Sequence, residues 1–149
     1  MNLQVLSKNK KETGVTLIEI LLVISIIAII GGVTAPVLSR LILYINLNSF
    51  ESKIVSTIRK AQEYSMDGKG TGIWGICISG NNLILYEGLC SNPLTSDSFS
   101  IPTSVTVSGL DDTNFNLRGE PSNILNISIS TNLDSRNIQD NAAGGLNVF

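Results

Sequence analysis

The chain has 149 residues, of which 43% are apolar and only 15% are charged, and it carries a formal net charge of −2 without any histidine. That length suffices for one domain, or for a smaller domain with an appendage. The lack of histidine excludes His-based catalysis and His metal ligation, and the slightly acidic balance argues against a strongly cationic nucleic-acid binder. The apolar residues are concentrated, since 17 of the 24 residues from Val15 to Leu38 are apolar.

The first predicted element is a membrane helix. Residues 1–14 hold three Lys and one Glu, whereas residues 20–39 carry no charge. At about 1.5 Å per helical residue, this uncharged run spans roughly the 30 Å hydrocarbon core of a bilayer. Because basic residues remain on the cytoplasmic side of a membrane segment, the rest of the chain is expected outside the cytoplasm. A cleaved secretory signal ending at residues 33–35 is the alternative, but such signals usually have shorter apolar cores.

Glu19 is a charged residue near the start of this apolar segment. A carboxylate in a membrane helix is costly and is by default functional, with a partner of opposite charge. The segment itself contains no Lys, Arg or His. The partner must therefore come from another chain, or from a new amino terminus made by cleavage.

A specific resemblance appears in residues 10–24, which read KKETGVTLIEILLVI. This stretch resembles the class III signal of type IV prepilins and type II secretion pseudopilins. The resemblance implies that a prepilin peptidase cuts between Gly14 and Val15 and N-methylates the new first residue. It further implies that Glu19 is the retained carboxylate of the mature chain and that Pro36 is the proline that kinks the helix. Val15 departs from the pattern, in which Phe is more usual.

The residue types suit that processing. Gly14 has no side chain to obstruct a protease that approaches an extended backbone. Cleavage would free the amine of Val15, which is a cation near neutral pH. Glu19 could then neutralise the amine of a neighbouring subunit and set the register of an otherwise apolar helix bundle, which favours specificity of assembly more than stability.

Two features are expected further along the helix. Gly31, Gly32 and Pro36 predict a local bend or melt near residues 31–36, although Gly and Pro are also simply tolerated in membrane helices. Beyond the bilayer, apolar residues recur at a spacing of three and four, which predicts an amphipathic helix lying on a soluble domain. These residues are Leu47, Phe50, Ile54, Ile58, Ala61 and Tyr64.

After Gly72 the sequence favours short strands. The expected strands are 73–79, 83–87, 98–101, 104–108, 114–117, 125–130 and 146–149, with a hairpin turn at residues 80–82. This pattern predicts an antiparallel sheet with one buried face, packed on the amphipathic helix, and hence an α+β fold. The expected organisation is a cleaved leader (1–14), a transmembrane or filament-core helix (15–39), an amphipathic helix (40–67) and a β-rich head (68–149).

Cys77 and Cys90 enclose 12 residues and would lie in an oxidising compartment under this orientation. A disulfide closing that loop would contribute about 3 kcal/mol. Two free buried thiols are the alternative, because a turn at residues 80–82 places Cys77 opposite a residue near 85. No zinc site is expected from two cysteines without histidine.

The head also resembles that of H-type minor pseudopilins and FimT-like minor pilins. The resemblance rests on loose motifs in the helix 50–66, in residues 115–119 and 124–131, and at Gly144-Gly145. It implies a possible role in DNA uptake, which makes DNA binding the competing function. Phosphate binding needs clustered basic residues, however. Only six basic residues follow position 50, against ten acidic ones, and Arg118 and Arg136 are isolated in sequence.

No catalytic site, metal site or cofactor is predicted. The serines lack a His base and a G-x-S-x-G elbow. Carboxylates at residues 111–112, Asp134 and Asp140 could form an acid/base pair or a calcium site, but their spacing matches no template, and we interpret them as solvated loop residues.

The sequence therefore predicts a non-enzymatic structural subunit, of the minor kind, in a type IV pilus or a type II secretion pseudopilus. It would be inserted once in the bacterial cytoplasmic membrane with its head outside the cytoplasm. The expected partners are other pilin or pseudopilin subunits, the prepilin peptidase and methyltransferase, and the inner-membrane assembly platform. A DNA-binding minor pilin and a generic single-pass membrane-anchored domain are the alternatives.

Overall fold

The computed structural model describes residues 14–70 and 72–149, and for residues 33–36 only the backbone. The basic residues of the expected leader and the side chain of Pro36 thus lie outside the described residues. The chain divides into two compact units, residues 1–38 and residues 39–149. Each unit is considered by itself.

A single helix, α1 (Leu17–Met66), contributes to both units. Its first turn is closed by the carbonyl of Thr16, which accepts hydrogen bonds from the amides of Glu19 and Ile20. The backbone is helical throughout residues 31–36, so the local melt expected there is absent from the structure. The expected bend stays a prediction.

The helix ends at Met66, just before Gly68. Gly68 donates its amide hydrogen to the Ser65 carbonyl at 3.1 Å, and Lys69 donates to the Tyr64 carbonyl at 3.0 Å. This pair of bonds is the Schellman arrangement, which satisfies carbonyls that the last helical turn leaves free. Lys69 also lies with its Nζ 3.6 Å from the centre of the Tyr64 ring.

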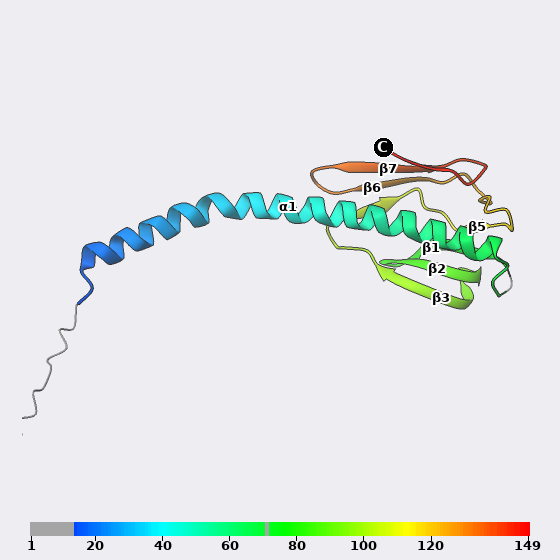
Figure 1. Ribbon diagram of the computed structural model, residues 1–149, viewed down its shortest axis with the longest axis horizontal. Coiled ribbons are helices and arrows are strands. Elements are labelled where there is room, and N and C mark those ends of the chain that lie inside the picture. Colours follow the sequence, from blue (N-terminus) through cyan, green and yellow to red (C-terminus); the bar gives the residue numbers. More distant parts are fainter. Residues whose placement is uncertain (1–13, 71) are drawn as a thin grey trace, which may run out of the picture. The chain divides into compact units, whose positions relative to one another are not determined.

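The second unit contains two antiparallel sheets of four strands (Figure 1). The first has the order β3-β2-β1-β5 and is built from β1 (Trp74–Ser79), β2 (Asn82–Leu89), β3 (Asn92–Ser100) and β5 (Thr113–Phe115). The second has the order β4-β6-β7-β8 and is built from β4 (Thr106–Ser108), β6 (Asn126–Ser130), β7 (Ser135–Asp140) and β8 (Leu146–Val148). The α+β fold class is thereby confirmed.

One hydrophobic core joins α1 to both sheets. The helix contributes the apolar face that its spacing predicted, in which Leu47, Phe50, Ile54, Ile58 and Ala61 are buried. The inner faces of the sheets contribute alternate strand residues, among them Ile76, Leu83, Leu85, Ile127, Ile129 and Ile138. Burial of such side chains stabilises the fold by about 1.5–3 kcal/mol each, and it is what holds the helix on the sheets.

The sheets differ from the prediction in three ways. There are two sheets where one was expected, β3 is longer than the expected strand 98–101, and β7 was not expected at all. The first seven residues of β3 are exposed, and β7 reads SRNIQD with Ile138 as its only apolar residue. Neither segment shows apolar alternation, which is the signal on which strand prediction depends.

Candidate functional site

The helix of the first unit is apolar and open to its surroundings. One helix among the described residues, Leu17–Met66, is long and apolar enough to cross a membrane. The large apolar side chains from Leu17 to Ile30 are about half to three-quarters exposed. A soluble chain would bury such a surface, so this segment requires a membrane or the helices of other subunits to cover it.

Glu19 lies on this open surface, in the first turn of the helix. It lines a shallow hollow of about 200 Å³ together with Val15, Ile20, Val23 and Ile24, so its carboxylate is framed by apolar side chains. Among the described residues, Glu19 forms no ion pair. Among the described residues other than its chain neighbours, Gly14 has no atom within 4 Å of the position that a Cβ would occupy, so this side of the Gly14–Val15 peptide bond is sterically open.

Residues 9–35 match the family described as the prokaryotic N-terminal methylation motif. The chain carries a pilin-type N-terminus. This motif is typical of type IV pilins and type II secretion pseudopilins, which are generally structural proteins, are processed by a prepilin peptidase and assemble with other pilins. The apolar helix that begins within this motif is consistent with a pilin anchored in the inner membrane. No curated protein and no solved structure matches this chain.

The disulfide between Cys77 and Cys90 is confirmed, with Cα atoms 6.3 Å apart. The strand register is close to the expected one, since Cys77 lies opposite Ile84. The two cysteines meet because β2 does not continue straight beyond the β1 pairing. Its register shifts between Glu87 and Gly88, and the chain that follows turns back toward β1. The register expected from the turn at residues 80–82 did not include this change of direction after Glu87.

A partly buried polar network involves Tyr86 of the disulfide hairpin. The hydroxyl of Tyr86, a fully buried residue, donates to the carboxylate of Asp112 and lies 2.7 Å from Oδ1 of Asn114. Burial raises the pKa of the Tyr86 phenol above its ordinary value, and the hydrogen bond to Asp112 raises it further. The phenol therefore stays protonated at neutral pH and acts as a hydrogen-bond donor that orders the β5 end of the sheet.

Gln62 is a structural residue that sequence reasoning missed. Its Nε2 donates to the carbonyl of Gly119 at 3.1 Å and to that of Gly144 at 2.9 Å. A Cβ on Gly144 would lie 2.5 Å from the Gly119 oxygen, so only glycine permits this approach. The H-type resemblance rests in part on the motifs around residues 119 and 144. Both are thus hydrogen-bonded to one side chain of α1.

The two arginines weighed for DNA binding lie beside different parts of α1. Arg136 is held in ion pairs with Asp134 at 2.9 Å and with Glu51 at 3.7 Å. Arg118 follows β5 in the turn whose Gly119 contacts α1 at Gln62. Glu51 and Gln62 are eleven positions apart in the helix, so the point where Arg136 contacts α1 and the point where the Gly119 turn contacts it are about 16 Å apart.

The acidic residues likewise do not converge on one site. Among the described residues, no group of three or more metal-ligating side chains is present. Asp112 accepts from Tyr86, Asp134 pairs with Arg136, and Asp140 lies on β7. The interpretation of Asp140 as a solvated loop residue is wrong, since this residue is only 3% exposed.

Asp140 is a buried carboxylate without a hydrogen-bond partner among the described residues. Burial raises its pKa above the ordinary value, and the nearby amide of Asn141 offsets only part of that effect. A folded-state pKa above the unfolded one means that the folded state binds the proton more tightly. The contribution of Asp140 to stability is therefore present below pH 4 and is lost as the pH rises through the folded pKa.

We expect Asp140→Asn to raise the free energy of unfolding at pH 7 by about 1–2 kcal/mol, because it removes an unpaired buried charge. Urea unfolding of the full chain in mild detergent can be followed by the fluorescence of Trp74, the single tryptophan, which is buried. The gain should shrink toward pH 4. Asp111→Asn, at an exposed position, is the control and should change little; an Asp140→Asn variant that is destabilised at pH 7 would contradict the argument.

Proposed function

We propose that this chain is a structural, minor subunit of a type IV pilus or a type II secretion pseudopilus. Its precursor is inserted in the cytoplasmic membrane of a bacterium, cut between Gly14 and Val15, and N-methylated on Val15. The observation that carries the proposal is the methylation motif at residues 9–35, whose apolar part forms the uncovered first half of α1. The inner-membrane assembly platform then draws the subunit into the filament through this helix.

Glu19 and the new amine of Val15 direct assembly in this proposal. Glu19 lacks an ion-pair partner among the described residues, and it lines a hollow with Val15 on the same helix surface. A carboxylate in an apolar medium needs an opposite charge, which the Val15 amine of a neighbouring subunit supplies. The pair then fixes the axial register of one helix against the next. Pro36 serves as the point where the helix bends in the filament.

We further propose that the chain belongs to the H-type subgroup of minor pseudopilins. It is supported by the way in which Gln62 joins the turns at residues 119 and 144, the two loop motifs that suggested this subgroup. The hydrogen bonds from Gln62 and the Cys77–Cys90 disulfide stabilise the head. Such a head suits a structural subunit.

The position of the cut provides the test. In the bacterium that makes the chain, mass spectrometry of the mature protein should find an N-methylated Val15 at its amino terminus. Gly14→Leu should block cleavage, so that the precursor accumulates, because the bulky side chain obstructs the peptidase. Gly31→Leu, within the helix, is the matched control and should be cleaved normally. A mature chain that begins at Pro36 would instead establish a secretory signal, and normal cleavage of Gly14→Leu would also contradict the proposal.

A further inference from the structure

The apolar surface of α1 continues beyond the expected membrane segment, into the unit that carries the head. We define the collar as residues 40–45, which follow the uncharged run 20–39 and read RLILYI. Arg40 is exposed, and four apolar side chains of the collar are each about half exposed. These four are Leu41, Ile42, Tyr44 and Ile45. Removing such a surface from water is favourable, so the collar requires an occupant that covers it.

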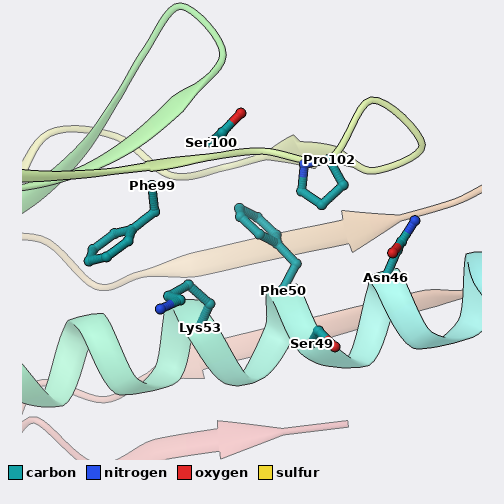
Figure 2. Close-up of a pocket in the computed structure, with 7 residues that line it drawn as sticks. All are labelled: Asn46, Ser49, Phe50, Lys53, Phe99, Ser100 and Pro102. Atoms are coloured by element: carbon teal, nitrogen blue, oxygen red, sulfur yellow. The ribbon is translucent and has the colours of Figure 1, made fainter.

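The collar ends abruptly at Asn46, where the head begins to cover the helix. Asn46 donates a hydrogen bond from its Nδ2 to Oγ of Ser104 at 3.1 Å. Figure 2 shows this part of α1, with Asn46, Ser49, Phe50 and Lys53, beside the end of β3 and Pro102. From position 46 to position 65, the exposed residues of α1 are Ser49, Ser52, Lys53, Ser56, Arg59 and Glu63. The exposed surface of the helix thus changes from apolar to polar directly after Ile45.

The length of the collar matches one headgroup region of a bilayer. At about 1.5 Å per residue, the uncharged run 20–39 is already long enough for the hydrocarbon core of about 30 Å. A bilayer with both headgroup regions measures about 40–45 Å, which leaves about 5–8 Å on each side. Residues 40–45 extend over about 8 Å of helix. They therefore fit the outer headgroup region, and the polar surface begins where water begins.

Arg40 and Tyr44 are residue types that membrane interfaces favour. They are four positions apart, so they lie on the same side of the helix in successive turns. A tyrosine ring has an apolar body and a polar hydroxyl, and an arginine can place its stem among acyl chains while its guanidinium reaches a phosphate. Arg40 forms no ion pair with any residue that the structure describes. Its guanidinium is therefore free to bind a lipid phosphate.

The same arginine argues against a second copy of this chain as the occupant. An apolar helix packed on the collar would bury the guanidinium without a counter-charge, which is strongly unfavourable. Phospholipids instead offer a phosphate for Arg40 and acyl chains for the apolar side chains at neighbouring depths. The collar also continues directly from the segment that is expected to cross the membrane.

The end of the head beside Asn46 also suits a phospholipid surface. It includes residues 101–105, which hold the acceptor of the Asn46 hydrogen bond and carry no charge. The antiparallel pairing of β4 with β6 places the turn between β6 and β7 at the same end. That turn presents Leu133, which is 55% exposed, and its carboxylate, Asp134, is paired with Arg136 at 2.9 Å.

We propose that the collar binds the phospholipid headgroup region of the outer leaflet of the cytoplasmic membrane. Tyr44 lies among the headgroups, Arg40 contacts a lipid phosphate, and the head rests on the membrane surface. The inference rests on the proposed function, because it requires an inserted helix. It adds the depth at which an unassembled subunit is held, and a subunit that enters a filament must exchange these lipids for its neighbours.

Fluorescence quenching tests the depth of the collar in the full chain, inserted in vesicles of phosphatidylethanolamine and phosphatidylglycerol. Tyr44→Trp in a Trp74→Phe background places the single tryptophan in the collar. One set of vesicles carries a nitroxide on the headgroup, and the other carries it near the end of an acyl chain. The headgroup nitroxide should quench position 44 about twofold more strongly than the acyl-chain nitroxide.

Two further positions in the same background calibrate the depth. Ile29→Trp, in the middle of the uncharged run, should be quenched mainly by the acyl-chain nitroxide, and Ser52→Trp, on the polar part of α1, by neither. Quenching of position 44 mainly by the acyl-chain nitroxide, or by neither nitroxide, would overturn the collar while position 29 still reports an inserted helix. Position 29 unquenched by the acyl-chain nitroxide would overturn the proposed insertion as well.

The role of Arg40 is tested by its effect on that depth. Arg40→Leu removes the charge that holds the collar at the phosphates, so the ratio of headgroup to acyl-chain quenching at position 44 should fall about twofold. Arg59→Leu, at an exposed position beyond the collar, is the matched control and should leave the ratio unchanged. An unchanged ratio in Arg40→Leu would overturn the assigned phosphate contact.

Photo-crosslinking checks the result without replacing Trp74. Benzoylphenylalanine at position 44 of the otherwise unchanged chain, in the same vesicles, should form adducts with phospholipid. Dimers of the chain in place of lipid adducts would show that a second copy covers the collar, and this would overturn the proposal.

Discussion

Replacing Glu19 by alanine is expected to leave membrane insertion intact and to lower incorporation into filaments at least tenfold. Insertion should become easier, because a carboxylate in a membrane helix costs up to about 2.5–3.5 kcal/mol and alanine removes that cost. Incorporation should fail because the Val15 amine of a neighbouring subunit loses its counter-charge, and an unpaired charge in an apolar medium is strongly unfavourable. The ratio of subunit in sheared filaments to subunit in membranes measures the effect.

The matched control for this experiment is Ser25→Ala. Ser25 is another polar residue of the same apolar helix, but its Oγ already donates to the Leu21 carbonyl of its own helix at 2.7 Å. Its replacement should therefore leave assembly unchanged. The role assigned to Glu19 fails if Glu19→Ala enters filaments at the wild-type ratio, or if it no longer inserts in the membrane.

Removing both cysteines, as Cys77→Ser with Cys90→Ser, is expected to lower the free energy of unfolding by about 3 kcal/mol. The disulfide closes a loop of modest length and so restricts the unfolded chain. The double variant leaves no free thiol to form wrong bridges. Urea unfolding of the full chain in detergent, followed by Trp74 fluorescence, gives the value, and reduction of the wild-type disulfide should reproduce it.

The same variant should expose the turn between β2 and β3 to proteases. Without the tether from Cys90, the pairing of Gly88 with Pro93 and of Leu89 with Asn92 holds the turn, and a loosened turn is a preferred site of cleavage. Ser79→Ala, at an exposed position on the same hairpin, is the control and should change neither stability nor cleavage. A loss below 1 kcal/mol would show that the bond adds little to a fold that the core already holds.

Much of the fold could be predicted because its signals are local. The spacing of Leu47, Phe50, Ile54 and Ile58 describes one face of a helix, and that face is the one that α1 buries. The alternation in residues 125–130 likewise predicts a strand that is half buried, which is what β6 is. In each case the pattern needs only a few neighbouring residues, and burial of one face enforces it.

The parts that could not be predicted depend on contacts between distant segments. β7 has a single buried isoleucine, so its pairing with β6 and β8 stabilises it more than its own composition does. Asp140 was expected in a solvated loop because charged residues are rarely buried. Its burial becomes visible only in the tertiary structure, where it lies on β7. The Gln62 contacts join residues 57 and 82 positions apart, which no spacing in the sequence indicates.

By itself, the sequence determined the pilin-type N-terminus, the single long apolar helix, the amphipathic face and the α+β class. These features follow from short motifs and from hydrophobic periodicity. A peptidase recognises a short extended segment, and a bilayer or a protein core contacts the side chains on one helix. The tertiary structure alone decided that the strands divide into two sheets and that Cys90 folds back to Cys77. Such features depend on strand register, bulges and long-range packing, where energies of many weak contacts are summed over residues far apart in the chain.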